Sequence, residues 1–273
     1  TQQHIVEALI RAQAATGYPA ILHAQDRRLI RATSRAAKEL SRSWLVTLRD
    51  PGLLCPIATC LLTHRTIPAD CGQGRLWRTC GPDYRALYRA GSPIGLAWRY
   101  AALKRIRRAR PAAAAFVSDG LRRVYVDAGW PAAGVPTAVL PSTVEIAPVM
   151  ADSLALAFRQ RYHFGDSRLV LFVGKPSPGK GWALFHHAAR ALGRRVIFAQ
   201  IGATPSGDNT DVTPVKALGI LPHATVQVAM RAADLVCVPS VWPDPLPRVA
   251  LEAAMQERPI LGTRVGGIPE IVE

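Results

Sequence analysis

Two lysines lie in a glycine- and proline-rich turn in the second half of the chain. Lys175 and Lys180 belong to the run 172–182 (FVGKPSPGKGW), which follows an apolar stretch and precedes an amphipathic one. The apolar stretch predicts a buried strand and the amphipathic one a helix. Ligands of open α/β sheets bind beyond the carboxyl ends of the strands, and two ammonium groups beside a helix N-terminus suit a diphosphate. A solvated turn is the alternative, and the glycine spacing does not match a P-loop.

Two carboxylates follow the apolar run 235–238. Asp244 lies in a proline-rich turn, and Glu252 lies in an apolar stretch that predicts a helix from about Pro247. Proline suits the first turn of a helix. A carboxylate among apolar neighbours needs a partner, and ribose hydroxyls would serve as well as a nearby arginine.

A glycine pair ends the series. Gly266 and Gly267 follow the apolar run 259–263, and because they lack side chains they allow the backbone to approach a ligand closely. Each of the three segments alone is weak evidence for a site. Their common order along the chain is the stronger observation.

In this order, the three segments resemble the donor domain of the retaining GT-B glycosyltransferases, the group 1 or glycogen-synthase-like family. The matching residues are Gly174-Lys175 with Lys180-Gly181, Leu218-Gly219-Ile220, Ala233-Asp234 with Pro239-Ser240, Asp244 with Glu252-Ala253, and Thr263 with Gly266-Gly267 and Glu270. The first half resembles the same family more loosely, through 46–50 (VTLRD), 53–56 (LLCP), 116–118 and 139–141.

The resemblance implies an α/β fold of the GT-B type, with two Rossmann-like parallel-sheet domains that face a cleft, both incomplete in this chain. The acceptor-side domain would span 1–145 and the donor-binding domain 146–273. The implied activity moves a sugar from a nucleoside-diphosphate sugar to a glycan, lipid or small-molecule acceptor with retention of configuration. The resemblance implies no metal and no cofactor, since lysines neutralise the leaving diphosphate.

Roles also follow from the resemblance, residue by residue. The donor site would comprise Lys175 and Lys180 at the diphosphate, Asp244, Leu246, Pro247 and Arg248 at the transferred sugar, Glu252 at the ribose, and Leu218, Gly219 and Ile220 at the base. The acceptor side of the cleft would carry Arg49, Asp50 and Ser118. No catalytic residue and no metal ligand is assigned.

Four positions depart from the family pattern. Lys175 replaces an arginine and loses bidentate phosphate geometry. Asp244 is one methylene shorter than the usual glutamate, and Pro247 replaces a glycine and so removes a backbone N–H. Arg49 replaces a histidine, and we expect it either to supply positive charge to a phosphate or to pair with Asp50.

The elements that position these residues follow from alternating patterns. Apolar runs predict strands at 20–24, 44–48, 112–117, 137–140, 168–173, 195–201, 215–220, 235–238 and 259–263. Helices are expected up to about Gly17 and at 94–109, 118–129, 182–192, 225–232 and 247–257. Such alternation predicts parallel sheets covered on both faces, in two units that meet near 142–155. The stretch 50–92 is too long for a simple connection.

Charge is uneven along the chain. The net charge of +15 divides into +12 for residues 1–150 and +3 for the rest. A basic helix contributes Lys104, Arg105, Arg107, Arg108 and Arg110. An anionic membrane surface would explain this excess, and an arginine-rich composition is the alternative. No nucleic-acid motif is present, no apolar run is long enough to span a bilayer, and no signal peptide is seen. We therefore expect a cytoplasmic protein, peripheral on the inner face of the plasma membrane.

Four of the five cysteines lie close together in sequence, at Cys55, Cys60, Cys71 and Cys80. They form no C-x-x-C pair, so the signal for a zinc site is weak. Cys237 lies in an apolar run and is expected in the core. Two rival interpretations of the whole chain stay open. One is an inactive GT-B remnant or a basic binding module, and the other is a different GT-B enzyme such as a sugar-nucleotide epimerase.

Overall fold

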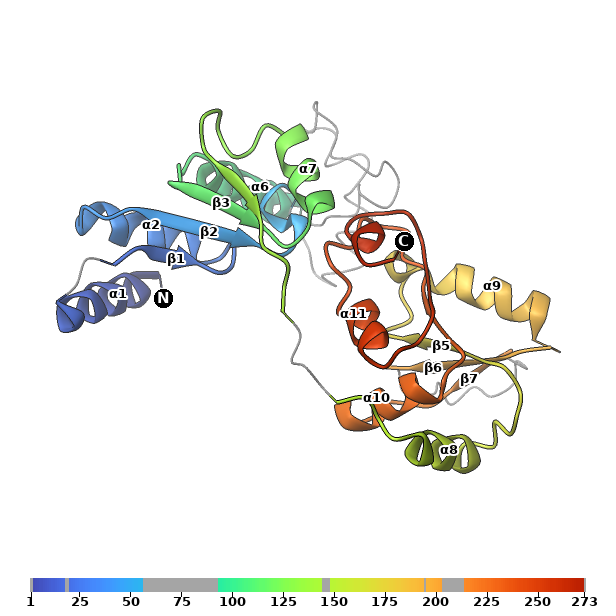
Figure 1. Cartoon of the computed structure of the whole chain (residues 1–273). Coiled ribbons are helices and arrows are strands. Elements are labelled where there is room, and N and C mark those ends of the chain that lie inside the picture. Colours follow the sequence, from blue (N-terminus) through green and yellow to red (C-terminus); the bar gives the residue numbers. More distant parts are fainter. Residues whose placement is uncertain are drawn as a thin grey trace. The chain divides into compact units, whose positions relative to one another are not determined.

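The computed structural model describes residues 2–17, 20–55, 93–143, 148–193, 195–202 and 214–272 (Figure 1). The chain divides into two compact units, Thr1–Ser142 and Thr143–Glu273. The sequence placed this division after residue 145, three residues further along. Each unit is built on one parallel sheet.

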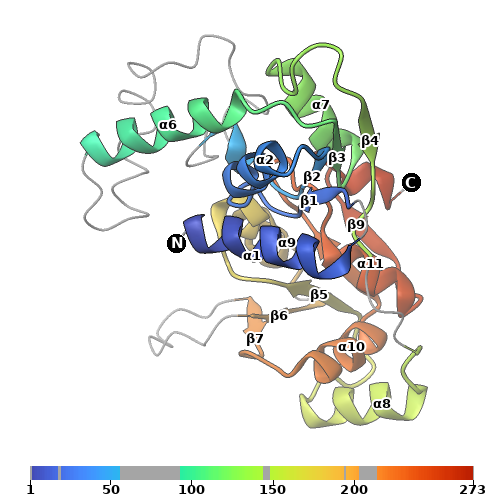
Figure 2. The same cartoon turned by 90° about the vertical axis from the view of Figure 1, so that its left-hand side faces the viewer.

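Unit 1 contains a four-stranded sheet in the order β1-β2-β3-β4. Its strands are β1 (Leu22–Ala24), β2 (Trp44–Leu48), β3 (Ala113–Phe116) and β4 (Thr137–Val139). Its helices are α1 (Gln2–Thr16), α2 (Ile30–Glu39), α6 (Pro93–Arg107) and α7 (Asp119–Asp127), with a short 3-10 turn η1 (Pro51–Leu53). Figure 2 shows α1 and α2 packed side by side next to β1, and α6 extending outward past the strands.

Local contacts fix the carboxyl ends of β2 and β3. Ser118 is the N-cap of α7, since its Oγ accepts from Leu121 N at 3.1 Å, a bond typical of serine at this position. From α7, the buried Tyr125 hydroxyl donates to Asp50 O at 2.9 Å and accepts from Leu53 N at 3.3 Å. Burial raises the pKa of Tyr125 far above its usual value. These bonds tie the segment after β2 to α7.

Unit 2 contains a five-stranded sheet in the order β7-β6-β5-β8-β9. Its strands are β5 (Leu169–Val173), β6 (Ile197–Ile201), β7 (Val215–Ala217), β8 (Leu235–Val238) and β9 (Ile260–Gly262). Its helices are α8 (Asp152–Arg161), α9 (Trp182–Leu192), α10 (His223–Ala232) and α11 (Arg248–Met255), with 3-10 turns η3 (Pro178–Lys180) and η4 (Ile268–Glu270). The chain runs outward from β5 through β6 and β7, then returns to place β8 on the other side of β5. The strand order therefore reverses between β5 and β8, and such a reversal is where open α/β sheets bind ligands.

Both faces of the second sheet are covered, as continuous apolar strands predict. On one face Leu169, Leu171 and Val236 pack with residues of α8, α10 and α11. On the other face Phe172 and Cys237 pack with the aromatic side chains of α9. Figure 1 shows α9 and the pair α8 and α10 on opposite sides of the strands. Cys237 is buried in the cluster with Phe172, so the core position expected for it is confirmed, and burial raises the pKa of its thiol to about 11.

Several element bounds differ from those expected. The strand expected at 215–220 ends at Ala217, shortly before Gly219, whose backbone is left-handed (φ +79°). Pro247 is the N-cap of α11, where it was expected in the first helical turn. Helices α2 and α8 were not expected at all.

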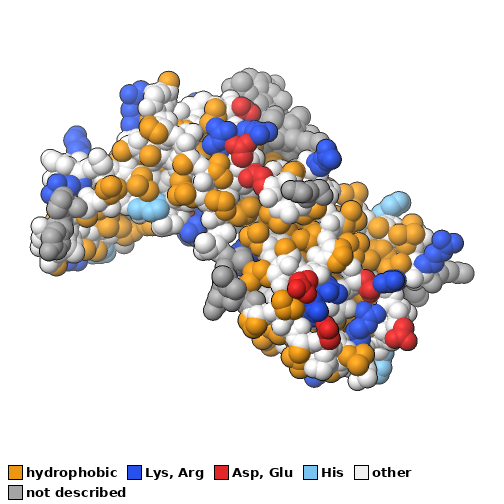
Figure 3. All heavy atoms as spheres, viewed as in Figure 1, with side chains coloured by type: hydrophobic (Ala, Val, Ile, Leu, Met, Phe, Trp, Pro, Cys, Tyr) orange, Lys and Arg blue, Asp and Glu red, His pale blue; other side chains and the backbone are white. Residues whose placement is uncertain are grey.

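Part of the sequence lies outside the described residues. The long stretch 56–92 is among this part, with Cys60, Cys71 and Cys80, so the weak zinc prediction stays untested; Cys55 is buried. Among the described residues, no helix is both long enough and apolar enough to span a membrane. On the face shown in Figure 3, Lys and Arg side chains are scattered, and several lie beside Asp or Glu.

Candidate functional site

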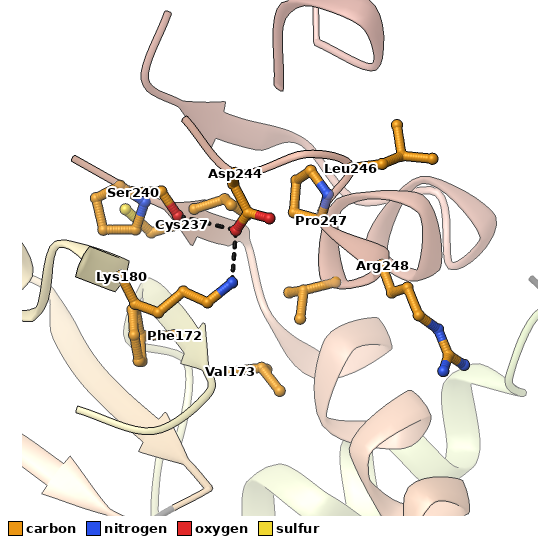
Figure 4. Close-up of a pocket in the computed structure, with 12 residues that line it drawn as sticks. Phe172, Val173, Lys180, Cys237, Ser240, Asp244, Leu246, Pro247 and Arg248 are labelled. Carbon is orange, nitrogen blue, oxygen red and sulfur yellow. Dashed lines mark hydrogen bonds and ion pairs between the residues drawn. The ribbon is translucent and has the colours of Figure 1, made fainter. Parts of the chain in front are cut away.

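A pocket of about 310 Å³ opens in unit 2 at the carboxyl ends of β5 and β8. It lies at the reversal of strand order described above. Its walls come from the segments after these two strands and from the start of α11. The lining residues are Phe172, Val173, Lys180, Cys237, Val238, Pro239, Ser240, Asp244, Leu246, Pro247, Arg248 and Val249. Figure 4 shows the pocket with the charged side chains among them.

Lys180 is placed at the pocket by a close contact between two loops. The next residue, Gly181, has φ +73° and joins η3 to α9. A Cβ atom on Gly181 would lie 1.7 Å from the carbonyl oxygen of Pro239. Val241 N also donates to Gly179 O at 3.0 Å. The lysine-bearing turn and the loop after β8 are therefore joined through backbone atoms.

Lys180 and Asp244 form an ion pair inside the pocket. Lys180 Nζ lies 2.5 Å from Asp244 Oδ2, and the same oxygen accepts from Ser240 Oγ at 3.3 Å (Figure 4). The Lys180 side chain is 42% exposed and that of Asp244 only 7%. The ammonium group also lies 5.8 Å from the centre of the Trp242 ring, within the range of a cation–π contact. A cation that ligands can reach thus faces a buried anion.

Gly266 and Gly267, which follow β9, contact the backbone of the loop that carries Asp244. Gly267 N donates to Asp244 O at 2.8 Å. Gly266 has φ +57°, and a Cβ atom there would lie 2.1 Å from the same carbonyl oxygen. The pair was expected to admit a ligand, and in the structure the space beside Gly266 is taken by the backbone of Asp244. The Thr263 hydroxyl adds a further bond, donating to Ser240 O at 2.5 Å.

Glu252 lies beyond the pocket on α11. Its side chain is 11% exposed, and Oε1 lies 3.4 Å from Arg248 Nη2 and 3.5 Å from His223 Nε2. Arg248 points away from the Lys180–Asp244 pair (Figure 4). Both partners expected for Glu252, a nearby arginine and the hydroxyls of a ribose, therefore stay open. Arg248 is mostly exposed, so a ligand could replace it. Sequence reasoning missed His223, because nothing in its local pattern indicates that α10 starts beside α11.

The segment expected near a nucleotide base follows β7. Leu218 is buried, Ile220 is 75% exposed, and the carbonyl of Gly219 accepts from Gly202 N at 2.9 Å. These residues do not line the pocket. Strand β7 is two positions from β5 in the sheet, a spacing of about 10 Å between strand axes. The segment thus lies at the same edge of the sheet as the pocket, displaced sideways.

The two lysines predicted at a diphosphate differ in position. Lys180 lines the pocket, whereas Lys175 is exposed in the turn after Gly174 and does not line it. Lys175 makes no salt bridge to any residue that the structure describes. Its role stays a prediction.

The residues predicted on the acceptor side lie in unit 1, where Arg49 and Asp50 each have a partner other than one another. Asp50 pairs with Arg27 at 2.7 Å and accepts from Gly52 N, whereas Arg49 Nη2 donates to Gln25 Oε1 at 3.0 Å. The expected alternative of an Arg49–Asp50 pair is therefore wrong. Ser118 is buried and its hydroxyl serves the cap of α7.

His23 is a further residue at this end of the first sheet that the sequence did not reveal. Its Nε2 lies 2.8 Å from Thr47 Oγ1, and its Nδ1 lies 3.0 Å from the Gln25 side chain. Partial burial, together with the charge of Arg49, lowers the pKa of this imidazole. Both ring nitrogens of His23 already have hydrogen-bond partners within unit 1.

Comparison with known proteins gives a family match within the second unit and two curated relatives that match part of the chain. Residues 167–273 match the family model described as "Glycosyl transferases group 1". The 2-deoxystreptamine glucosyltransferase of Streptomyces kanamyceticus is 29% identical over 152 residues, which are 50% of this chain and 38% of that protein. The D-inositol 3-phosphate glycosyltransferase of Mycobacterium tuberculosis is 36% identical over 122 residues, 39% of this chain and 25% of that protein. The matched segments thus span well under half of these relatives.

Solved structures match both units. Anabaena HepE in complex with UDP-glucose aligns with a TM-score of 0.64 and 20% identity, over 98% of this chain and 65% of that chain. A UDP-forming α,α-trehalose-phosphate synthase from Burkholderia xenovorans aligns with a TM-score of 0.59 and 15% identity, over 98% and 64%. The GT-B fold expected from the sequence, with two Rossmann-like parallel-sheet units, is confirmed.

Proposed function

We propose that the protein transfers a sugar from a nucleoside-diphosphate sugar to an acceptor, since residues 167–273 match the family model described as "Glycosyl transferases group 1". The observation that carries the proposal is the Lys180–Asp244 pair in a pocket where the strand order reverses. Lys180 offers a reachable cation to a diphosphate, and Asp244 offers a carboxylate to sugar hydroxyls beside it.

The remaining donor contacts follow from the same edge of the sheet. The ribose lies at Glu252, whose basic neighbours within 4 Å in the described part of the chain are Arg248 and His223. The base lies along Leu218–Ile220, about 10 Å from β5. Support for this path comes from the arrangement of these residues and from UDP-glucose in the HepE structure, which has the same fold.

Two finer features of the reaction belong to the proposal. Transfer proceeds with retention at the anomeric carbon, as the family resemblance implies. It needs no divalent metal, because Lys180 stabilises charge on the leaving diphosphate. Turnover in excess EDTA, with an α-anomeric product from an α-linked donor by proton NMR, is the expected result. Loss of turnover in EDTA or an inverted product would contradict these two features separately.

Binding and turnover of sugar nucleotides test the central proposal. We expect calorimetry with UDP-, GDP- and ADP-glucose to show binding of at least one donor, and we expect its sugar to appear on a glycan, lipid or small-molecule acceptor. Binding without transfer or hydrolysis would favour an inactive binding protein. Conversion of the sugar nucleotide into its epimer would favour an epimerase. Absence of binding by all three would remove the proposal.

We also propose that the protein works at the cytoplasmic face of an anionic membrane. The observation that favours this is the surface of α6 and the residues after it. Trp98 is 74% and Ile94 79% exposed, and Lys104, Arg105, Arg108 and Arg110 are exposed at the other end. Exposed tryptophan suits the interface of a bilayer, and exposed basic residues are attracted to an anionic one.

Co-sedimentation with liposomes tests this second proposal. Binding is expected to rise with the fraction of phosphatidylglycerol and to fall as salt shortens the Debye length. Replacing Arg105, Arg107 and Arg108 together by Ser is expected to weaken it, because each basic residue near the surface contributes about 1 kcal/mol. Replacing Arg122 and Arg123 by Ser serves as the control, since both already pair with Asp119. Equal binding to neutral and anionic vesicles would leave a soluble acceptor as the better proposal.

A further inference from the structure

The two members of the pocket ion pair differ in how freely they move. The Asp244 side chain is 7% exposed and that of Lys180 42%. The backbone of Asp244 is held on both sides, since its carbonyl accepts from Gly267 N at 2.8 Å and its N–H donates to Trp242 O at 2.7 Å. The anion is therefore fixed in the wall of the pocket, whereas the ammonium lies at the end of a flexible side chain that reaches solvent.

Asp244 has few donors. Its Oδ2 accepts from Lys180 and from Ser240, and no other side chain in the described ranges donates to its carboxylate. Arg248, the other cation in the lining, extends away from it (Figure 4). If a ligand takes Lys180, one hydroxyl remains as the donor to a buried negative charge, and such a charge is costly without a partner.

We propose that Asp244 is a displaceable counter-ion of Lys180, and that this exchange makes the pocket favour a sugar nucleotide over a bare nucleoside diphosphate. The inference rests on the proposed function and deepens it. A bare diphosphate binds the ammonium group of Lys180, breaks its ion pair with Asp244 and leaves this carboxylate without a cation. The diphosphate of a sugar nucleotide binds Lys180 in the same way, but the sugar hydroxyls then donate to Asp244. After transfer these hydroxyls leave with the acceptor, so Asp244 regains Lys180 and promotes release of the diphosphate.

Titration of UDP, GDP and ADP and of their glucose conjugates into wild type and Asp244→Asn tests the exchange. For the nucleotide that binds, we expect the substitution to lower the Kd of the bare diphosphate about three- to tenfold, because the competing anion is gone. We expect the preference for the glucose conjugate over the bare diphosphate to fall about tenfold, because a charged acceptor for hydroxyls is lost. A damaged pocket would bind the bare diphosphate more weakly, whereas the exchange predicts that it binds more tightly while the preference for the conjugate falls.

A double-mutant cycle separates exchange from simple repulsion between Asp244 and the ligand. If Asp244 acts through Lys180, Asp244→Asn has little effect on diphosphate affinity in a Lys180→Ala background. Simple repulsion predicts at least the same tightening in both backgrounds. Asp234→Asn is the matched control, because Asp234 also pairs with a cation, Arg168 at 2.8 Å, but does not line the pocket. We expect it to leave both affinities unchanged.

The outcomes distinguish this inference from the proposed function. If wild type binds none of the six ligands, the proposed function fails. If it binds them and Asp244→Asn does not tighten diphosphate binding, or tightens it equally without Lys180, only the counter-ion exchange is wrong. Thermal unfolding checks that each variant is folded, and Asp244→Ser replaces Asp244→Asn in the same comparison if the asparagine variant does not fold.

Discussion

Lys180 owes its position to contacts that a single substitution leaves intact. The backbone of its turn is joined to the loop after β8 through Gly181 and Gly179, so the loss of the ammonium group does not release the turn. The Lys180 side chain can therefore be removed to measure what its charge contributes to ligand binding. Lys175, exposed in the same turn, offers a control with an equal change of charge.

At the residue scale we predict that Lys180→Ala weakens nucleoside-diphosphate binding about 10- to 100-fold, the loss of one charge-assisted hydrogen bond. We predict that Lys175→Ala weakens it about fivefold or less, because charges in solvent are screened. Isothermal titration calorimetry at one ionic strength measures both. Equal losses for the two variants would place the diphosphate midway along the turn, and no loss for either would show that the turn does not bind it.

At the scale of elements, the glycine pair after β9 supports the Asp244 loop. Gly266 combines a left-handed backbone with a space already filled by Asp244. Gly165 has nearly the same backbone, with φ +55°, but nothing lies within 4 Å of where its Cβ would be. The two glycines therefore separate the cost of backbone conformation from the cost of a steric clash.

We predict that Gly165→Ala lowers the free energy of unfolding by about 1 kcal/mol, the cost of a left-handed alanine. Gly266→Ala should lower it by about 3 kcal/mol or more, because backbone atoms must also move apart. It should weaken sugar-nucleotide binding as well, since the loop carrying Asp244 is displaced. Denaturant titrations and calorimetry measure these effects. Similar losses for both variants would show that Gly266 is needed only for its backbone angle.

Most elements could be predicted from the sequence because buried parallel strands are continuous apolar runs. Helix α2 was missed although its pattern is amphipathic, because its buried face carries one large apolar side chain, Ile30, beside small residues such as Ala32 and Ala36. Helix α8 buries Ala155 and Phe158 and exposes Leu154 and Leu156, so it shows no clear apolar stripe. In α8, tertiary packing rather than periodicity decides the structure.

The partners within the site were less predictable than the site itself. The types and order of residues indicated Lys180, Asp244 and Glu252, but not that Lys180 contacts Asp244, 64 residues away. That contact depends on β8 lying next to β5, and strand order is not encoded in local patterns. For the same reason the sequence did not predict that Asp50 pairs with Arg27 instead of with Arg49, the residue before it in the chain.

At the scale of the whole molecule, the residues predicted to bind the donor all lie in unit 2. Each unit has its own sheet, and ligand binding stabilises only the part that folds around the ligand. The two units should therefore respond differently to a nucleotide. The unit boundary at Ser142–Thr143 makes this difference measurable.

We predict two calorimetric unfolding transitions, of which a nucleoside diphosphate raises only the one that belongs to unit 2. At one hundred times the Kd the stabilisation is about 2.7 kcal/mol. Hydrogen exchange should show that the stabilised part is unit 2, with slower exchange in 169–182 and 235–252 and no change in β1 to β4. Slower exchange confined to unit 1 would show that the nucleoside diphosphate binds unit 1 and that the predicted donor site in unit 2 is wrong.

The contact between Gly181 and the Pro239 carbonyl also constrains how this chain can diverge or be recombined. With a side chain at position 181, the turn 174–181 would not fit against the present 239–247 loop. A chimera that imports the turn from a relative therefore fits this loop only if the imported turn has glycine at the position of Gly181. Over generations, a side chain at this position would be tolerated only after the loop carrying Pro239 had moved away.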